Sequence, residues 1–362
     1  MGAIYFTVTT NLSFDQRMIR ICSSLSAAGY EVVLVGRNTP GSPALLQMPY
    51  RQERLRCFFH KGKLFYAEYN LRLFFFLLTK KMSAICAIDL DTILPVLWTS
   101  RLKKIPRVYD AHELFCEMKE IVTRPNIHRV WKWIEQKSVP HFRHGYTVNS
   151  VIAEEFKRMY GRSYEVIRSI AVYRPELQQQ TKENFILYQG AINEGRSFET
   201  IIPAMQWVNA PLYLCGDGNF MEQAKELVRK YGLADKVIFR GLIQPEALRE
   251  ITARAKIGLT IFENNGLSNY FSLANRFFDY VHAGVPQLCV DFPVYRELNN
   301  SHEIAVLIED LSPENIAEQL NSMLADEGNW RRLHNNCLQA AKEWNWEEEE
   351  KKLLAFYKQL IG

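Results

Sequence analysis

Three stretches of this chain combine residue types that could carry out or assist a reaction. The first is YDAHELF, residues 109–115, where Asp110, His112 and Glu113 follow a short apolar run that ends at Val108. A strand interior disfavours so many polar groups, so we expect a strand to end here beside a ligand site. A histidine next to carboxylates could act as a base with its orienting group, or bind a hydroxyl group. The alternative is a histidine whose hydrogen bonds are satisfied within a loop.

The second stretch, ILYQGAINEGRSFETII at residues 186–202, has the pattern of a strand, a glycine-containing loop and a helix. A helix N-terminus offers free N–H groups and partial positive charge, which suit a phosphate, and Arg196 adds a full charge. GAINEGRS differs from a P-loop by having Arg196 where the lysine belongs. A guanidinium does not reach between phosphate oxygens as a compact ammonium does, which argues against an NTPase. The alternative to phosphate binding is a plain turn with a surface arginine.

The third stretch is FENNGLSNYFSLANRFFDYVHAGVPQLCVD, residues 262–291. Its pattern predicts a helix with Ser272 as N-cap and Gly284 as C-terminal stop. Ser272, Arg276 and Asp279 then share one stripe, with Asn275 beside it, and span about 10 Å. Such a helix could hold a diphosphate at its start and hydrogen-bond ribose hydroxyls two turns later. The alternative is an amphipathic surface helix with an Arg/Asp pair.

Apolar, β-branched runs alternate with helical patterns along the whole chain, which is typical of parallel sheets covered by helices on both faces. We expect an α/β fold with two doubly wound domains, whose ligands bind at the carboxyl ends of the strands in a cleft between them. Polar residues 174–184 predict a linker between an N-terminal domain (1–173) and a C-terminal domain (185–340). A final helix, 341–362, is expected to pack back toward the N-terminal domain. Local patterns also predict a strand at CFFH (57–60) and helices near 14–28, 64–79, 93–102 and 220–231.

Composition excludes several classes of protein. The seven cysteines are far apart and form no C-x-x-C pattern, which argues against a zinc site or a disulfide framework and fits a reducing cytosol. No apolar run reaches the roughly 18 residues of a membrane-spanning helix, and the N-terminus lacks the features of a signal peptide. Residues 1–150 hold 21 Lys and Arg against 11 Asp and Glu, so this half could attract an anionic partner or membrane surface. The aromatic segment 64–81 could lie on a membrane, although its nearly all-round apolar pattern favours a buried helix.

Taken together and in order, these segments resemble retaining glycosyltransferases of the GT-B fold, in particular bacterial members of glycosyltransferase family 4. The resemblance covers nearly the whole chain. It includes NLSFDQRMIRICSSLSAAGYEVVLVGR, IPRVYDAHELF, YTVNSVIAEEFKRMYG, YQGAINEGRSFETII, LYLCGDG, VIFRGLI, SLANRFFDYVHAGVP and NWEEEEKKLLAFY.

The resemblance implies a metal-independent, hexosyltransferase-like enzyme that uses no cofactor. It would move a sugar from a UDP- or GDP-linked donor, held by the C-terminal domain, to an acceptor hydroxyl, retaining the anomeric configuration. The acceptor would be a glycan or lipid-linked, as in surface polysaccharide or glycoconjugate synthesis, and no nucleic acid is involved. The enzyme would be cytoplasmic, with possible peripheral contact at the inner membrane face. The implied catalytic residues are His112, Arg196 and Arg276. The implied donor-binding residues are Gly190, Arg196, Gly216, Gly241, Ser272, Leu273, Asn275, Arg276 and Asp279, and those on the acceptor side are Asp15, Arg17, Asp110, His112 and Glu113.

Three positions depart from the family pattern. The first glutamate of its Glu-x7-Glu signature falls at Phe271, the second is Asp279, and an arginine that often follows the first glycine of the second domain is Ala191. The contact made by the absent glutamate would come from Glu263, Asn269 or the backbone of residues 270–273. Three alternatives share parts of the pattern: a GT-B sugar-nucleotide epimerase, a P-loop-like NTPase, and a nucleotide-binding protein that has lost catalysis.

Overall fold

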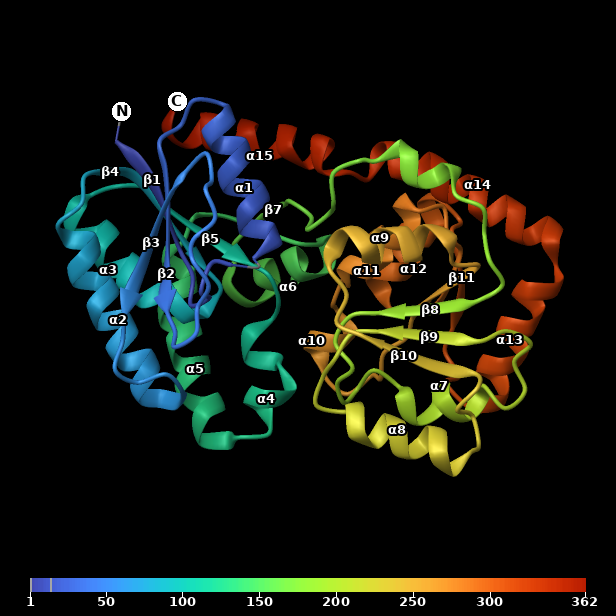
Figure 1. Ribbon diagram of the computed structural model, residues 1–362. Coiled ribbons are helices and arrows are strands. Elements are labelled where there is room, and N and C mark those ends of the chain that lie inside the picture. The colour runs from blue at the N-terminus through green and yellow to red at the C-terminus, as the bar shows by residue number, and fades with distance from the viewer. Residues whose placement is uncertain (1, 14) are drawn as a thin grey trace. The chain divides into compact units, whose positions relative to one another are not determined.

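The computed structural model of the chain describes residues 2–13 and 15–362 and consists of two compact units (Figure 1). The first unit comprises Met1–Ser169 and Glu349–Gly362, and the second comprises Ile170–Glu348. The chain therefore leaves the first unit after Ser169 and returns to it within its last helix.

The first unit is built on a seven-stranded parallel sheet. Its strands are β1 (Ala3–Thr7), β2 (Val32–Asn38), β3 (Arg51–Arg56), β4 (Met82–Ile88), β5 (Arg107–Ala111), β6 (His144–Thr147) and β7 (Glu165–Val166). Their order is β3-β2-β1-β4-β5-β6-β7, so the direction of strand addition reverses between β1 and β4. In an open α/β sheet such a reversal creates a crevice beyond the carboxyl ends of the two strands, where ligands usually bind.

Helices connect these strands, as the predicted alternation requires. They are α1 (Gln16–Ala27), α2 (Gly62–Leu78), α3 (Ile93–Lys103), α4 (Lys119–Val122), α5 (Pro125–Ser138) and α6 (Ser150–Tyr160), with 3-10 turns η1 (Leu90–Thr92), η2 (Phe115–Glu117) and η3 (Val139–His141). α1 begins two residues later than the predicted bound, Phe14, which lies outside the described residues. Asn149 caps α6 by accepting a hydrogen bond from the Ile152 N–H, and Gly161 ends it in the left-handed conformation.

The second unit repeats the architecture with a six-stranded parallel sheet. Its strands are β8 (Ile186–Gln189), β9 (Leu212–Cys215), β10 (Val237–Gly241), β11 (Ile257–Thr260), β12 (Gln287–Val290) and β13 (Ala305–Ile308). The order is β10-β9-β8-β11-β12-β13, so the reversal lies between β8 and β11. The predicted fold class, two doubly wound parallel-sheet domains, is therefore confirmed.

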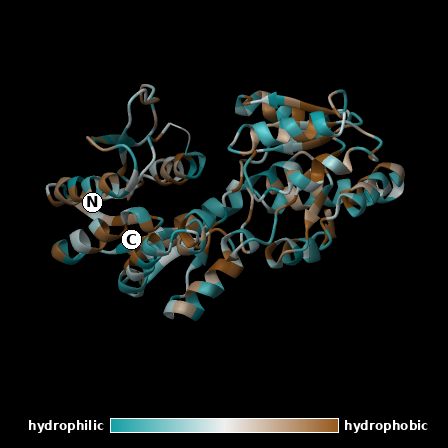
Figure 2. Cartoon of the chain, turned by 90° about the horizontal axis from the view of Figure 1, so that it is seen from below, coloured by the Kyte–Doolittle hydropathy of each residue, from teal (hydrophilic) through white to brown (hydrophobic). Residues whose placement is uncertain are grey.

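The helices of the second unit cover both faces of its sheet. They are α7 (Phe198–Ala204), α8 (Met221–Lys230), α9 (Pro245–Arg254), α10 (Leu267–Tyr270), α11 (Asn275–His282), α12 (Pro293–Ser301), α13 (Pro313–Ala325) and α14 (Glu327–Glu343), followed by α15 (Trp346–Ile361), which crosses into the first unit. Figure 1 shows α7 and α8 on one side of β8–β10 and α9, α11 and α12 on the other. The helices carry both hydrophobic and hydrophilic segments in Figure 2, as helices packed on one side require.

Two local predictions differ from the structure. The strand expected at residues 57–60 lies instead at β3, whose sequence RQERLR is almost entirely polar. β3 is an edge strand of the sheet, and charged side chains are common there because they discourage pairing with other chains. The apolar pattern of CFFH was therefore a misleading signal.

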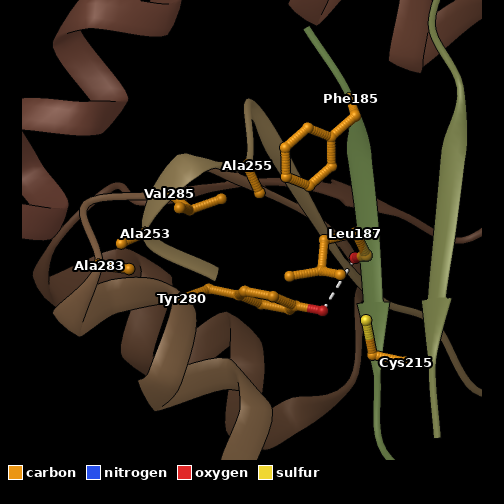
Figure 3. Close-up of a cluster of buried hydrophobic side chains, with 8 residues drawn as sticks. All are labelled: Phe185, Leu187, Cys215, Ala253, Ala255, Tyr280, Ala283 and Val285. Atoms are coloured by element: carbon orange, nitrogen blue, oxygen red, sulfur yellow. Dashed lines mark hydrogen bonds between the residues drawn. The ribbon is translucent and has the colours of Figure 1, made fainter. Parts of the chain in front are cut away.

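The segment 174–184, predicted to be a linker, is packed against the second unit. It contains the 3-10 turn η4 (Pro175–Gln179), and Leu177 packs against the apolar cluster shown in Figure 3. The Lys182 ammonium donates to the backbone carbonyls of Ala253 (2.7 Å) and Ala283 (2.6 Å), and its burial lowers its pKa to about 8. The chain passes from the first unit to the second after Ser169, upstream of residues 174–184, where composition predicted the linker.

That apolar cluster fixes the position of α11 on the sheet (Figure 3). The Tyr280 ring lies over β11 at Gly258, where a Cβ would come within 2.6 Å of the ring. Its hydroxyl donates a 2.9 Å hydrogen bond to the Leu187 carbonyl of β8. Tyr280 is fully buried, so this bond satisfies a group that would otherwise be costly to bury. The two strands at the reversal point thus hold the helix that carries Arg276 and Asp279.

Candidate active site

Three glycines line the carboxyl edge of the second sheet. Gly190 directly follows β8, Gly216 directly follows β9, and Gly241 is the last residue of β10. The Gly190 N–H donates to the Cys215 carbonyl (2.9 Å), and the Gly216 N–H donates to the Gly241 carbonyl (2.8 Å). A Cβ on Gly216 would lie 1.8 Å from the Gly190 carbonyl oxygen, so only glycine fits there. This edge is therefore a side-chain-free strip of backbone, suited to close approach by a ligand.

Arg276 lies beside this strip with two unused hydrogen-bond donors. Its side chain is 8% exposed, and its guanidinium lies over the Tyr188 ring, 4.5 Å from the centroid. Nη1 donates to the Tyr188 hydroxyl (3.1 Å) and the Gln189 carbonyl (3.2 Å). Among the described residues, Nε and Nη2 have no hydrogen-bond partner. Buried guanidinium N–H groups without a partner are costly, which points to an anionic ligand.

Arg196 shares an aromatic ring with Arg276. Both guanidinium carbons lie 4.6 Å from the centroid of the Phe262 ring, which follows β11. Cations stack favourably on aromatic faces, so the buried ring of Phe262 keeps two positive charges close to one another. Arg196 and Arg276 were predicted to bind one diphosphate, and the structure brings them together on this ring.

Asp279 is one turn further along α11 and is held by a hydrogen-bond chain. The Gln189 side-chain amide donates to the Asp279 carboxylate (2.9 Å), and the Thr252 hydroxyl donates to the Gln189 amide oxygen (2.6 Å). Gln189 is the last residue of β8, so the chain links α11 to the reversal point. A half-buried carboxylate held this way can accept hydrogen bonds from vicinal hydroxyls such as those of a ribose.

The predicted N-cap at Ser272 is wrong. α11 begins at Asn275, with Ala274 in the N-cap position, and Ser272 instead donates to the Asn269 carbonyl (2.8 Å) at the end of α10. The stripe of Ser272, Arg276 and Asp279 on one helix is therefore reduced to Arg276 and Asp279. Leu273 and Asn275 lie at the approach to α11, half-buried and exposed respectively. Gly284 does follow the helix in the left-handed conformation, as predicted.

The helix after the Arg196 loop is short. α7 spans seven residues and begins after Ser197, which adopts the left-handed conformation. The Glu263 N–H donates to the Gly195 carbonyl (3.1 Å), which ties this loop to the segment after β11. Glu263 is one of the residues expected to replace the contact of the absent glutamate, and this backbone hydrogen bond joins it directly to the Arg196 loop. Asn269 donates to the Asn265 side chain (2.6 Å).

A second set of polar residues lies in the first unit, at the carboxyl ends of β4 and β5. His112 Nε2 is 3.1 Å from Asp110 Oδ2, and His112 Nδ1 is 3.3 Å from Asp89 Oδ2. The His112 backbone N–H also donates to Asp89 Oδ1 (2.8 Å). Burial alone would lower the pKa of His112, but the two carboxylates outweigh it and raise the pKa to about 9. With a carboxyl group at each ring nitrogen, His112 is placed to act as a cation rather than as a base.

Asp110 is compensated on its other side by Arg17. Arg17 Nη2 and Nε donate to the two Asp110 oxygens at 2.8 and 3.1 Å, and Nη1 donates to the Ile167 carbonyl. Burial would raise the pKa of Asp110, but Arg17, followed by His112, holds it below its usual value. Arg17 and Asp110 are both buried, and Asp15 caps α1 by accepting from the Met18 N–H. Glu113 is half-buried beside His112 in the chain.

Several residues of these two sites were not predicted from the sequence. Asp89 has a positive φ of 50° after β4, and burial raises its pKa to about 7. The sequence analysis did not single out Asp89, nor Tyr188 and Gln189 at the end of β8 or Phe262 after β11. Polar or aromatic residues at the ends of β8 and β11 would have been a usable signal, had the strand order been known.

Within residues 2–13 and 15–362, no group of three or more His, Cys, Asp or Glu side chains is arranged to hold a metal ion. No described helix has the length and apolar character needed to span a membrane.

Comparisons with known proteins agree with this geometry. Residues 169–344 match the family "Glycosyl transferases group 1". An uncharacterized glycosyltransferase of Methanocaldococcus jannaschii is 22% identical over 193 residues, which cover 51% of this chain and about half (47%) of that relative's length.

Solved structures with the same fold cover nearly the whole chain. Sucrose-phosphate synthase from Thermosynechococcus elongatus has a TM-score of 0.80 at 18% identity, covering 99% of both chains. HepE of Anabaena, in complex with UDP-glucose, has a TM-score of 0.77 at 12% identity, covering 99% of this chain and 100% of that one. The family match over the second unit and the GT-B fold of the chain together support glycosyl transfer as the activity.

Proposed function

We propose that this protein is a retaining glycosyltransferase that moves a sugar from a nucleoside diphosphate donor to an acceptor hydroxyl. The observation that carries the proposal concerns the buried Nε and Nη2 of Arg276, beside the glycine strip and Arg196. Neither nitrogen has a hydrogen-bond partner in the part of the chain that the structure describes. A diphosphate would accept from these groups in charge-assisted hydrogen bonds, which are about twice as strong as neutral ones.

The donor is expected to be a UDP- or GDP-linked sugar. The HepE structure contains UDP-glucose, and its shared fold supports a nucleotide-sugar in the second unit. Asp279 would accept from the ribose hydroxyls, and Gly190, Gly216 and Gly241 would let the ligand approach the backbone. We assign the contact with the donor sugar to Glu263, because its backbone is tied to the Arg196 loop.

Arg196 and Arg276 would assist the reaction by stabilising the negative charge that develops on the leaving diphosphate. Fixed donors aimed at developing charge are usually the largest single contribution to catalysis. We propose that this occurs without a metal ion, since two guanidinium groups already lie beside the Phe262 ring and can supply the positive charge. His112 would act through its positive charge on the acceptor side, because both of its nitrogens face carboxylates.

The acceptor is proposed to be a glycan or a lipid-linked glycan at the cytoplasmic face of a membrane, as part of surface polysaccharide or glycoconjugate synthesis. The excess of basic residues in the first 150 positions supports an anionic surface or acceptor.

The proposal is tested by incubating the protein with a panel of UDP- and GDP-sugars and measuring release of the nucleoside diphosphate. Release of UDP or GDP with formation of free or transferred sugar would support a transferase. An epimerase would instead give a new sugar nucleotide, and an NTPase would hydrolyse a nucleoside triphosphate with Mg²⁺. Binding of a donor that stays intact with every acceptor offered would indicate a protein without catalysis.

The matched control for this assay is Arg296→Ala. Arg296 lies on α12 in the same unit and is half-exposed, paired with Asp291 at 2.7 Å. Its replacement removes the same charge as Arg276→Ala but leaves the glycine strip and the Phe262 ring untouched. Release that depends on Arg276 and not on Arg296 would locate the reaction at the proposed site.

A further inference from the structure

A basic pocket of about 410 Å³ lies at the amino end of the first unit's sheet, opposite to the end that carries His112. Arg107 is the first residue of β5 and His144 is the first residue of β6. The walls come from three consecutive connections: α3 to β5, η3 to β6, and α6 to β7. The basic residues lining the pocket are Arg101, Arg107, His141, Arg143, His144 and Arg162.

The positive charge of this pocket is not compensated by the protein. None of its described lining residues is acidic. The four arginine side chains form no ion pair or hydrogen bond with any described residue, and Nε of Arg162 is buried without a partner. Two other arginines of the same unit differ: Arg72 pairs with Glu68 at 2.7 Å and Arg158 pairs with Glu155.

The cations also act on one another. Burial, and then the charges of Arg101 and Arg143, lower the pKa of Arg107. Burial, and then Arg101, Arg107 and Arg162, lower the pKa of His141. The C-termini of α3 and α6 carry partial negative charge that favours nearby cations, but this effect does not supply hydrogen-bond acceptors. Repulsion among unpaired cations destabilises a protein unless an anion binds between them.

We propose that this pocket is a second anion-binding site, which takes a terminal phosphate group with more than one negative charge. Guanidinium groups present paired N–H donors that match phosphate oxygens, so several arginines around one pocket favour phosphate over a carboxylate. The phosphate could belong to a soluble diphosphate or to a phospholipid headgroup such as that of phosphatidic acid. The site shares no residue with the proposed donor site, so it stands whether or not that proposal is correct.

The test uses the full-length protein, its double variant Arg143→Gln/Arg162→Gln, and a charge-matched control, Arg72→Gln/Arg158→Gln. Binding of inorganic pyrophosphate is measured by calorimetry without divalent metal ions. Binding to phosphatidylcholine vesicles with and without phosphatidic acid is measured by sedimentation. Pyrophosphate could also bind near Arg276, so the titration is repeated with Arg276→Ala, which leaves the pocket intact.

We expect the double variant to bind about tenfold more weakly or worse, while the control and Arg276→Ala retain the binding. Loss in the pyrophosphate titration would identify a soluble phosphate compound as the ligand. Loss confined to the phosphatidic acid vesicles would identify a lipid headgroup. Arg143 is exposed, so Arg143→Gln alone should leave folding unchanged, and we expect a smaller loss of binding in the same direction. The proposal is wrong if the wild type binds neither probe, or if the double variant and the control bind equally well.

Discussion

The regions around His112 and Arg276 both place a cation at the carboxyl end of a parallel sheet, yet they differ in how that charge is balanced. His112 has a carboxylate at each ring nitrogen, and Arg17 neutralises Asp110 from the other side. Among the described residues, Arg276 has only neutral hydrogen-bond partners, a tyrosine hydroxyl and a backbone carbonyl, and its Nε and Nη2 have none. A site whose charges are balanced internally does not need a ligand, whereas a buried and unbalanced cation indicates one.

The comparison therefore supports the proposed diphosphate-binding role of the region around Arg276 and a positioning or electrostatic role for His112. The apolar support under the Arg276 site agrees with this division. α11 is fixed by Tyr280 to both strands at the reversal point, so the Arg276 donors are held in place before any ligand arrives (Figure 3). Such preorganisation lowers the cost of binding and of stabilising developing charge.

The largest effect is expected for Arg276→Ala. Loss of the buried guanidinium removes up to three donors from the diphosphate, and kcat/KM for the donor should fall about 10²–10³-fold. Arg276→Lys should recover little, because an ammonium cannot reproduce the paired N–H geometry. Steady-state kinetics with the active sugar nucleotide measure the effect, with Arg296→Ala as control. If Arg276→Ala has the kcat/KM of the wild type, Arg276 does not bind the diphosphate, and the proposed difference between the two regions is wrong.

A smaller loss is expected for Arg196→Ala. Arg196 shares the Phe262 ring with Arg276 but belongs to a loop, so it can contribute one charged hydrogen bond worth about 1.5–3 kcal/mol. This corresponds to a decrease in kcat/KM of about 10–100-fold. The same kinetic assay applies. A loss as large as that of Arg276→Ala would show that the two arginines act as one unit, and no loss would exclude Arg196 from the site.

His112→Ala should lower turnover by about tenfold or more and leave nucleotide affinity nearly unchanged. The reason is that His112 belongs to the first unit, whereas the nucleotide is proposed to bind to the second unit. Turnover is measured with saturating donor, and affinity by titration with UDP or GDP. Lower affinity with unchanged turnover would assign His112 to the nucleotide pocket and reverse the comparison.

The smallest but most specific expectation concerns the titration of His112. Its imidazole should titrate near pH 9, and Asp89→Asn should move the midpoint down toward the ordinary value of 6.5. Because the folded pKa is raised, the contribution of His112 to the free energy of unfolding is complete below pH 6.5 and is lost as the pH rises through 9. NMR of the labelled imidazole measures the midpoint. A midpoint at or below 6.5 would mean that the carboxylates do not balance the histidine.

Much of the fold could be predicted because it depends on local patterns. The alternation of apolar runs with helical segments and the glycine stop at Gly284 are encoded by neighbouring residues, and both were correct. The prediction of Ser272 as an N-cap failed because two helix signals overlap there. The serine hydroxyl donates to a carbonyl at the end of α10 and does not cap the start of α11. The strand expected at CFFH failed because an edge strand can be polar.

The site was only partly predictable because it depends on which strands become neighbours. Arg276 and Asp279 were singled out by their helical spacing together with the family resemblance, because spacing alone equally fits a surface helix with an Arg/Asp pair. Phe262 and Tyr188 support the two arginines only because β8 and β11 are adjacent, and their separation of 74 positions hides this in the sequence. Asp89 is similarly brought to His112 by the pairing of β4 with β5. The sequence could not show that Nε and Nη2 of Arg276 have no hydrogen-bond partner among the described residues. That observation needs the hydrogen bonds of the folded structure.

The central claim, that the open donors of Arg276 bind the donor's diphosphate, is tested most directly by a binding cycle. Affinities of the wild type and of Arg276→Ala are measured by calorimetry for a nucleoside diphosphate and for the same nucleoside without phosphate. We predict that removing the diphosphate weakens binding strongly in the wild type and only slightly in Arg276→Ala, so that the two changes are not additive. Equal losses in both proteins would show that the diphosphate binds elsewhere and would contradict the claim.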